Sequence, residues 1–201
     1  MATFCTDAGH GGSDNGSVWK NMAEKDLNLK YALALNAVLK QRGHRVLTTR
    51  KSEKAAPNLA TRCQLVNLHH SQKSPRFDAI ISIHCGVAAY KNPQTRQYVA
   101  NHATRGFYAI YNRESIKSRD LASSIANAAI KAGITVKNGG KLSTLELGRS
   151  LAWIHKTLPP AVLVELGFLT NDEEMQLLND SDHQDKIITA IADGIENYVM
   201  E

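Results

Sequence analysis

The sequence of 201 residues has no long apolar run. None of its stretches approaches the roughly 18 apolar residues that a membrane-spanning helix needs, so we expect no transmembrane segment. Aromatic residues make up only 6% of the chain and there are five prolines, while 43% of the residues are hydrophobic and 21% charged. This balance excludes a disordered chain and is typical of a globular protein. At this length we expect one domain with a sizeable core.

Cysteine is scarce as well. The chain has only Cys5, Cys63 and Cys85, and no two of them form a C-x-x-C pair. An odd, scattered set argues against a disulfide framework and suits a reducing compartment. We expect all three to be small buried apolar side chains. Cys85 alone adjoins a candidate functional residue, His84.

A secretory signal is also missing. The chain enters an expected strand near residues 3–6 without a basic segment or an apolar segment before it. We therefore expect synthesis without a signal peptide. A signal or partner domain trimmed from the chain stays open as an alternative.

The charge is positive, with a formal net value of +5. Such a charge favours an anionic partner, which could be a nucleic acid, a membrane surface or an acidic polymer such as cell wall. The basic residues are spread out, without interleaved aromatics and without a nucleic-acid-binding motif. We therefore expect no nucleic-acid partner and interpret most of these charges as a solvated surface.

Short apolar runs alternate with segments of helical periodicity. This alternation predicts an α/β fold with a mostly parallel sheet flanked by helices on both faces. Residues 10–17, 86–105 and 136–147 show neither pattern, and we expect loops there. The expected strands cover residues 3–6, 45–49, 79–83, 106–111 and 161–164, and the expected helices cover residues 24–42, 59–69, 118–132 and 182–199.

Three titratable residues follow strands of this predicted sheet. His10 comes after the first strand, His84 after the third and Glu165 after the last. In an open parallel α/β sheet, sites form outside the carboxyl ends of the strands. The topology therefore predicts that these three side chains lie at one rim.

Glu24 reaches the same rim by another route, because it opens the first helix. On a helical wheel it lies within about 20° of Tyr31 and of Leu35, so it shares the inward face. A buried carboxylate is costly unless it is paired or binds a metal. An ion pair with Arg or Lys is one explanation, but two histidines at the same rim favour a metal.

His10, Glu24 and His84 together form a candidate zinc site. Two imidazoles and one carboxylate are a ligand set of catalytic zinc, which keeps a fourth position open. A single histidine at a strand end is more often a surface or core-edge residue, so the prediction depends on the set. We assign that ordinary role to His44, His69, His70, His102, His155 and His183.

Glu165 follows an apolar run, residues 161–164, and precedes another apolar stretch. Apolar surroundings raise the pKa of a carboxyl group, which suits proton transfer near neutral pH. We interpret Glu165 as the general base. The alternative is a strand-end glutamate that caps a neighbouring helix.

Five segments in order resemble the motifs of a known family. The sequence is similar to the zinc-dependent N-acetylmuramoyl-L-alanine amidases of type 3 from about residue 3 to residue 199. Each motif alone is weak, but the ordered set is specific. The segments are residues 7–12 (DAGHGG), 24–25 (EK), 47–50 (LTTR), 81–84 (ISIH) and 160–171 (PAVLVELGFLTN).

This resemblance implies a six-stranded sheet and one Zn²⁺ per chain, held by His10, Glu24 and His84, with Glu165 as catalytic residue. The implied reaction is hydrolysis of the peptidoglycan amide between the lactyl group of N-acetylmuramic acid and L-alanine. We expect residues 1–201 to be a single catalytic domain without a separate cell-wall-binding domain, acting as a monomer. A basic amidase of this size looks like an endolysin that reaches the wall after release. A trimmed domain of a secreted amidase is the alternative.

The sequence departs from the usual family pattern at two positions. Ala8 stands where proline is commoner, and Gly86 stands where an asparagine usually follows the second histidine by two. We expect the first change to loosen a turn and the second to remove an amide near the metal. Asp7 either orients His10 or forms a turn.

Two other functions stay open. A zinc peptidase or carboxypeptidase would keep the metal and cut another amide bond. A non-catalytic wall-binding module would retain only a relic of the site. The presence of Glu165 together with all three expected ligands argues against the relic.

Overall fold

One six-stranded sheet forms the centre of the computed structural model, which describes residues 1–54 and 56–200. Its strand order is β4-β1-β5-β10-β8-β9, and every neighbouring pair is parallel except β10 with β8. The predicted α/β fold with a mostly parallel sheet is therefore confirmed. The strands are β1 (Thr3–Ala8), β4 (Arg45–Thr48), β5 (Ala79–Gly86), β8 (Phe107–Tyr111), β9 (Val136–Ser143) and β10 (Ala161–Phe168).

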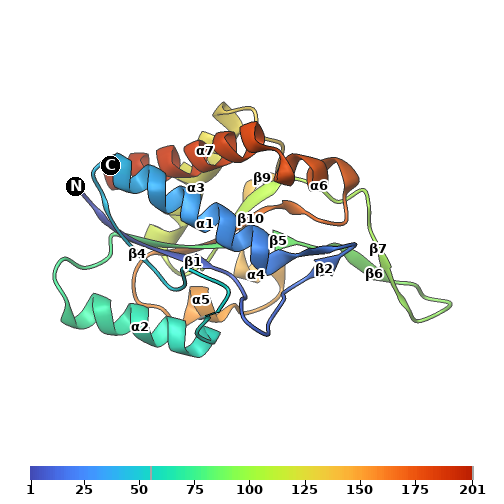
Figure 1. The fold of residues 1–201 in the computed structure, drawn as a ribbon, viewed down its shortest axis with the longest axis horizontal. Coiled ribbons are helices and arrows are strands. Elements are labelled where there is room, and N and C mark those ends of the chain that lie inside the picture. The colour runs from blue at the N-terminus through green and yellow to red at the C-terminus, as the bar shows by residue number, and fades with distance from the viewer. Residues whose placement is uncertain (55, 201) are drawn as a thin grey trace.

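Helices cover both faces of the sheet, as expected. Three long helices, α1 (Glu24–Gln41), α3 (Ile116–Lys131) and α7 (Ser181–Met200), lie on one face, and α2 (Leu59–Gln72) and α5 (Ala152–His155) lie on the other (Figure 1). The short helix α6 (Asp172–Asn179) joins β10 to α7, and α4 (Thr144–Leu147) follows β9. None of the helices in the described part of the chain is long and apolar enough to cross a membrane.

Two apolar clusters fill the space between the layers. Ile81 of β5 packs in the cluster under α1, α3 and α7, whereas its neighbour Ile80 packs in the cluster under α2 and α5. Successive side chains of a strand point to opposite faces, so a strand buried on both faces needs apolar residues throughout. On α1, Leu27, Tyr31 and Leu35 recur at helical spacing and are all buried. Each such burial contributes about 1.5–3 kcal/mol.

The segment of residues 136–147, which we expected to be a loop, forms β9 and α4 instead. β9 lies at the edge of the sheet beside β8, and the pairing of these two strands shifts register after Phe107. Asn138 and Gly139 have left-handed backbone conformations there, with φ of 51° and 66°. An edge strand interrupted in this way lacks the apolar alternation that sequence analysis detects. Ser143 and Glu146 form a capping box that starts α4.

The expected loop over residues 86–105 also contains structure. β6 (Ala89–Lys91) and β7 (Tyr98–Ala100) form an antiparallel hairpin that projects from the body of the molecule (Figure 1). Both strands are largely exposed, which is why no apolar pattern marks them. A second small hairpin, β2 (Val18–Trp19) with β3 (Met22–Ala23), leads into α1.

Candidate metal centre and catalytic cleft

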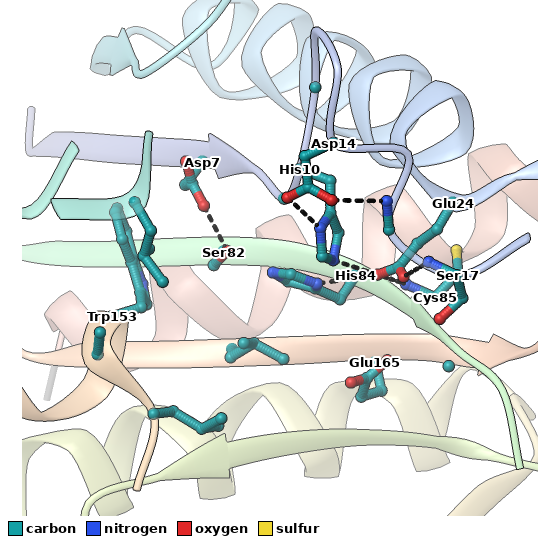
Figure 2. Close-up of a pocket in the computed structure, with 18 of the residues that line it drawn as sticks. Asp7, His10, Asp14, Ser17, Glu24, Ser82, His84, Cys85, Trp153 and Glu165 are labelled. Carbon is teal, nitrogen blue, oxygen red and sulfur yellow. Dashed lines mark hydrogen bonds and ion pairs between the residues drawn. The ribbon is translucent and has the colours of Figure 1, made fainter. Parts of the chain in front are cut away.

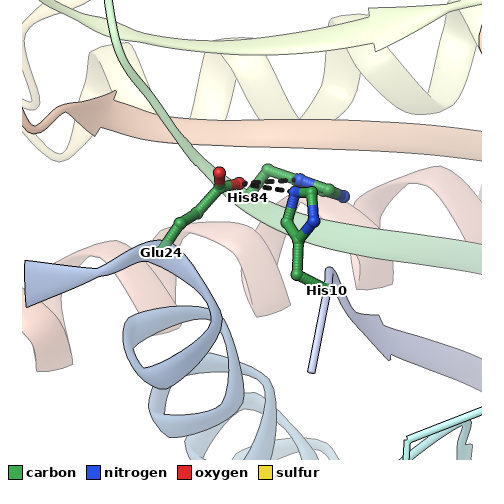
Figure 3. A group of neighbouring side chains, drawn as sticks. All are labelled: His10, Glu24 and His84. Carbon is green, nitrogen blue, oxygen red and sulfur yellow. Dashed lines mark hydrogen bonds and ion pairs between the residues drawn. The ribbon is translucent and has the colours of Figure 1, made fainter. Parts of the chain in front are cut away.

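His10, Glu24 and His84 come together at the rim of the sheet (Figure 3). Each offers one ligand atom within 4.8 Å of the others. Oε1 of Glu24 lies 2.9 Å from Nδ1 of His84 and 3.4 Å from Nε2 of His10. The three residues come from the loop after β1, the first position of α1 and the end of β5, as the topology predicted.

The loop after β1 bends sharply to place His10. The residue has a left-handed backbone conformation, with φ of 62°, and the two glycines after it also have positive φ. Nδ1 of His10 lies 2.8 Å from Oδ2 of Asp14, which turns Nε2 towards Glu24. Asp14 also accepts a hydrogen bond from the amide of Gly16, 2.9 Å away. The partner that orients His10 is therefore Asp14 rather than Asp7.

Asp7 holds the base of this loop instead. Its carboxylate pairs with Arg62 at 3.0 Å and accepts a hydrogen bond from Ser82 at 2.6 Å. Arg62 also donates to the backbone carbonyl of His10 at 2.5 Å. A second buried guanidinium, Arg50, donates to the carbonyl of Gly9 at 3.1 Å. Two cations therefore satisfy carbonyl groups that the left-handed bend leaves without helix or sheet partners.

Two glycines allow the rings to approach the backbone closely. A Cβ atom at Gly9 would lie 2.3 Å from the His84 ring, and one at Gly16 would lie 2.6 Å from the His10 ring. Any side chain at these positions would displace a candidate ligand. The glycine-rich character of residues 9–16 therefore follows from the packing of the two imidazoles.

Glu24 is buried and its hydrogen bonds are satisfied. Its side chain accepts hydrogen bonds from the amides of Ser17 at 2.8 Å and Cys85 at 3.3 Å. Among the described residues, the basic groups within ion-pair distance of Glu24 are the two imidazoles, not the Arg or Lys of the alternative explanation. Burial raises the pKa of this carboxyl, but the hydrogen bonds with His10 and His84 outweigh that effect and leave the pKa well below its usual range.

The same contacts shift the pKa of His10 in the opposite direction, upwards. Its hydrogen bond with Glu24 raises the pKa of the imidazole to about 9, although burial lowers it. Without a metal, a proton on His10 supplies the positive charge that the carboxylate requires. Two imidazoles and one carboxylate so arranged could hold a metal cation.

Glu165 lies on the same face of the sheet as His84. The two residues are register partners on β10 and β5, and Tyr108 is the partner of Glu165 on β8. β10 continues to Phe168, so Glu165 lies within the strand rather than at its end. The side chain is 9% exposed and points into the cleft (Figure 2).

The carboxyl of Glu165 is incompletely satisfied. Its Oε2 atom is buried and has no hydrogen-bond partner among the described residues. Burial raises the pKa of this carboxyl to about 7. The capping role considered for it belongs to other residues, since Asn171 caps α6 and Glu174 accepts from the amides of Phe168 and Gly106. Glu165 therefore has the properties of a proton-transfer group.

Gly86 lies beside Glu165. A Cβ atom there would be 3.4 Å from Oε2 of Glu165 and 3.1 Å from the ring of Phe168. The amide that an asparagine would bring to this position is absent next to Oε2 of Glu165, which is buried and has no partner among the described residues. The departure from the family pattern thus affects Glu165 rather than the three candidate ligands.

A cleft of about 780 Å³ contains all four predicted residues. His10, Glu24 and His84 lie along one side and Glu165 on the sheet beneath, while Trp153 of α5 belongs to the opposite wall (Figure 2). The other six histidines lie outside the described three-residue cluster. The three cysteines are buried and free, as predicted.

Comparison with known proteins identifies the chain. Residues 5–197 match the family model described as N-acetylmuramoyl-L-alanine amidase. The chain belongs to this family. It is 28% identical to the germination-specific N-acetylmuramoyl-L-alanine amidase of Bacillus subtilis, over 97% of this chain and 78% of the relative.

Solved amidase structures share the fold. The catalytic domain of CwlV, an amidase from Bacillus (Paenibacillus) polymyxa var. colistinus, superposes with a TM-score of 0.77 at 29% identity, covering 100% of this chain and 99% of that one. An amidase from Clostridium difficile 630 gives a TM-score of 0.80 at 27% identity, covering 100% and 97%. The resemblance inferred from the five sequence motifs is therefore confirmed.

Proposed function

We propose that this amidase hydrolyses the bond between the lactyl group of N-acetylmuramic acid and L-alanine in peptidoglycan, with Zn²⁺ held by His10, Glu24 and His84. The proposal depends above all on one observation. An unsatisfied, buried carboxyl, Glu165, adjoins a His–Glu–His cluster in a single cleft. Family membership supports the choice of bond.

The residues fit a zinc ion. Two imidazoles and a carboxylate with a depressed pKa would supply three ligands, and the cleft leaves room for substrate beside them. Bound Zn²⁺ supplies a Lewis acid that polarises the scissile carbonyl and makes water more acidic. Asp14 keeps the Nδ1 side of His10 engaged, so Nε2 stays directed at the cluster.

Glu165 would move the proton. Its carboxylate accepts a proton from the attacking water and then delivers that proton to the nitrogen of the departing L-alanine. A pKa of about 7 suits both steps, because the group must accept and release a proton in one cycle.

The remaining expectations accompany this proposal. We propose that residues 1–201 act as one catalytic domain on peptidoglycan, and that the substrate is the cell wall rather than a nucleic acid. The monomeric state and the endolysin-like release stay predictions.

Digestion of purified sacculi tests the function. We expect mass spectrometry to find new L-alanine amino termini and no new reducing sugar ends. Cleavage within the peptide stem would identify a peptidase instead. Binding to sacculi without release of any product would identify a non-catalytic wall-binding module.

A further inference from the structure

Arg149 joins two cavities. It follows Gly148, the C-cap of α4 with a left-handed φ of 73°, and precedes α5. Its exposed side chain lines both the catalytic cleft and an adjoining outer cavity of about 530 Å³. A ligand that extends from the cleft into the outer cavity would therefore pass this guanidinium.

The guanidinium of Arg149 is unpaired in the described part of the chain. It makes no hydrogen bond or ion pair with the other described residues, whereas the other cationic groups of the cleft are engaged. Arg62 pairs with Asp7, and the two imidazoles contact Glu24. A free guanidinium offers five donors in a planar fork that matches a carboxylate.

The outer cavity adds positive charge. Arg113 and His155 line it together with Arg149, and Glu114 is the acidic residue that lines it within the described chain. The ring of His155 is held by Thr144, with Nε2 3.1 Å from Oγ1. With two arginines against one glutamate, this surface favours an anionic ligand.

The two sides of the substrate differ in charge. On the sugar side, the lactyl carboxyl is consumed in the scissile amide and the N-acetylated sugars are neutral. On the peptide side, a second residue linked through its side chain, such as D-glutamate, keeps a free α-carboxylate. That group lies two residues from the scissile bond, at most about 7 Å along an extended chain.

We propose that Arg149 binds the free carboxylate of the second stem-peptide residue and thereby sets which end of the cleft receives the peptide. This inference builds on the proposed amidase function and assigns its peptide subsite to the boundary between the two cavities. A planar, charge-assisted contact would position the substrate without taking part in proton transfer.

A pair of substrates that differ in one charge tests this assignment. Both are N-acetylmuramyl tripeptides with an amidated C-terminus, one containing D-glutamate and the other D-isoglutamine as second residue. We expect the protein to favour the carboxylate form by about tenfold in kcat/KM, mainly through KM, as a charge-assisted hydrogen bond at a partly exposed site would give. Arg149→Met should remove the preference, and Arg149→Lys should restore part of it.

Arg119→Met is the matched control, since Arg119 is an exposed arginine of α3 that lines neither cavity. It should keep the full preference. Equal rates on both substrates, or an equal loss on both in Arg149→Met, would overturn the assignment while leaving the amidase function standing.

A binding measurement keeps the two hypotheses apart. Calorimetry with the product peptide L-alanyl-γ-D-glutamyl-L-lysine amide and its isoglutamine analogue reports binding at the subsite without any cleavage. We expect tighter binding of the carboxylate form, lost in Arg149→Met. Equal binding of the two peptides contradicts the subsite, whereas cleavage of another bond contradicts the function on which it rests.

Discussion

Glu24 and Glu165 lie in the same cleft and both are buried, yet their surroundings differ. Glu24 opens α1, where it accepts hydrogen bonds from backbone amides and faces two imidazoles. Glu165 lies within β10, between His84 and Tyr108, and one of its oxygens has no partner in the described structure. The pKa of the first carboxyl falls well below its usual range, and that of the second rises to about 7.

This difference shows how one site obtains two functions from one residue type. A carboxyl that stays ionised can hold a metal ion, while a carboxyl with a pKa near neutrality can exchange a proton. The hydrogen-bond partners explain the division. Ser17 in the loop before β2 and Cys85 in β5 each donate a backbone amide to Glu24, and two imidazoles face it. Oε2 of Glu165 has no such donor among the described residues.

Removing a partner of Glu24 should have the largest effect. We expect His84→Ala to lower the zinc content from about one per chain towards zero and to abolish lysis of sacculi, because it deletes one of three ligands. Metal analysis measures the zinc content, and the loss of turbidity of a sacculus suspension measures lysis. His183→Ala, on α7, is the control and should retain zinc and activity. Normal zinc content in His84→Ala would remove this residue from the ligand set.

Neutralising each glutamate in the metal-free protein should change stability in opposite directions. The native pKa of Glu165 exceeds its ordinary value of 4.5, so the unmodified protein loses stability as the pH rises from about 4.5 to 7. Glu165→Gln has no ionisable group at this position, so it does not lose this stability. At pH 8 it should be more stable than the unmodified protein by at most about 3 kcal/mol. Near pH 4 the two proteins should unfold at similar temperatures.

For Glu24 the sign is reversed. Its native pKa lies below the ordinary value, so its ionised form stabilises the fold above pH 4.5 and that stability is lost as the pH falls. Glu24→Gln should therefore unfold at a lower temperature than the unmodified protein at pH 8. Thermal unfolding in chelator compares the three proteins. A shift of the same sign for both variants would contradict the division of roles.

The smallest predicted effect is a release of protons. His10 is protonated at pH 7 in the metal-free protein, because Glu24 raises its pKa to about 9. Zinc needs the neutral ring, so binding should release about one proton at pH 7. Titration calorimetry in buffers of different ionisation enthalpy measures this number. A binding enthalpy that does not vary with the buffer would show that His10 keeps its proton or was neutral beforehand.

Much of this arrangement could be predicted from the sequence. The rule that parallel strands end on the same side of a sheet predicts that His10, His84 and Glu165 lie at one rim. The position of Glu24 on the inward face of α1 predicts that it joins them. Arg62 could not be found this way, because its contacts with Asp7 and the His10 carbonyl join residues more than 50 positions apart. The contact of Asp14 with His10 could have been predicted, since Asp14 follows His10 by four residues in the same polar loop.

The structural predictions failed where the apolar pattern is weak. β9 contains two glycines and lies at the edge of the sheet, so only its pairing with β8 reveals it. The hairpin of β6 and β7 is exposed on both strands and gives no burial signal. Arg149 follows β9 and α4, two elements that the sequence analysis did not predict. Its position in the cleft is therefore known only from the structure.

Zinc content and sacculus lysis, measured side by side in Glu24→Gln and Glu165→Gln, test the two roles most directly. Glu24→Gln should lose zinc and activity together, because a neutral amide is a poor zinc ligand. Glu165→Gln should keep about one zinc per chain and lose at least 10²–10⁴-fold in activity, roughly the contribution of general acid–base catalysis. Loss of zinc in Glu165→Gln, with zinc and lysis retained in Glu24→Gln, would show that the two glutamates have each other's roles.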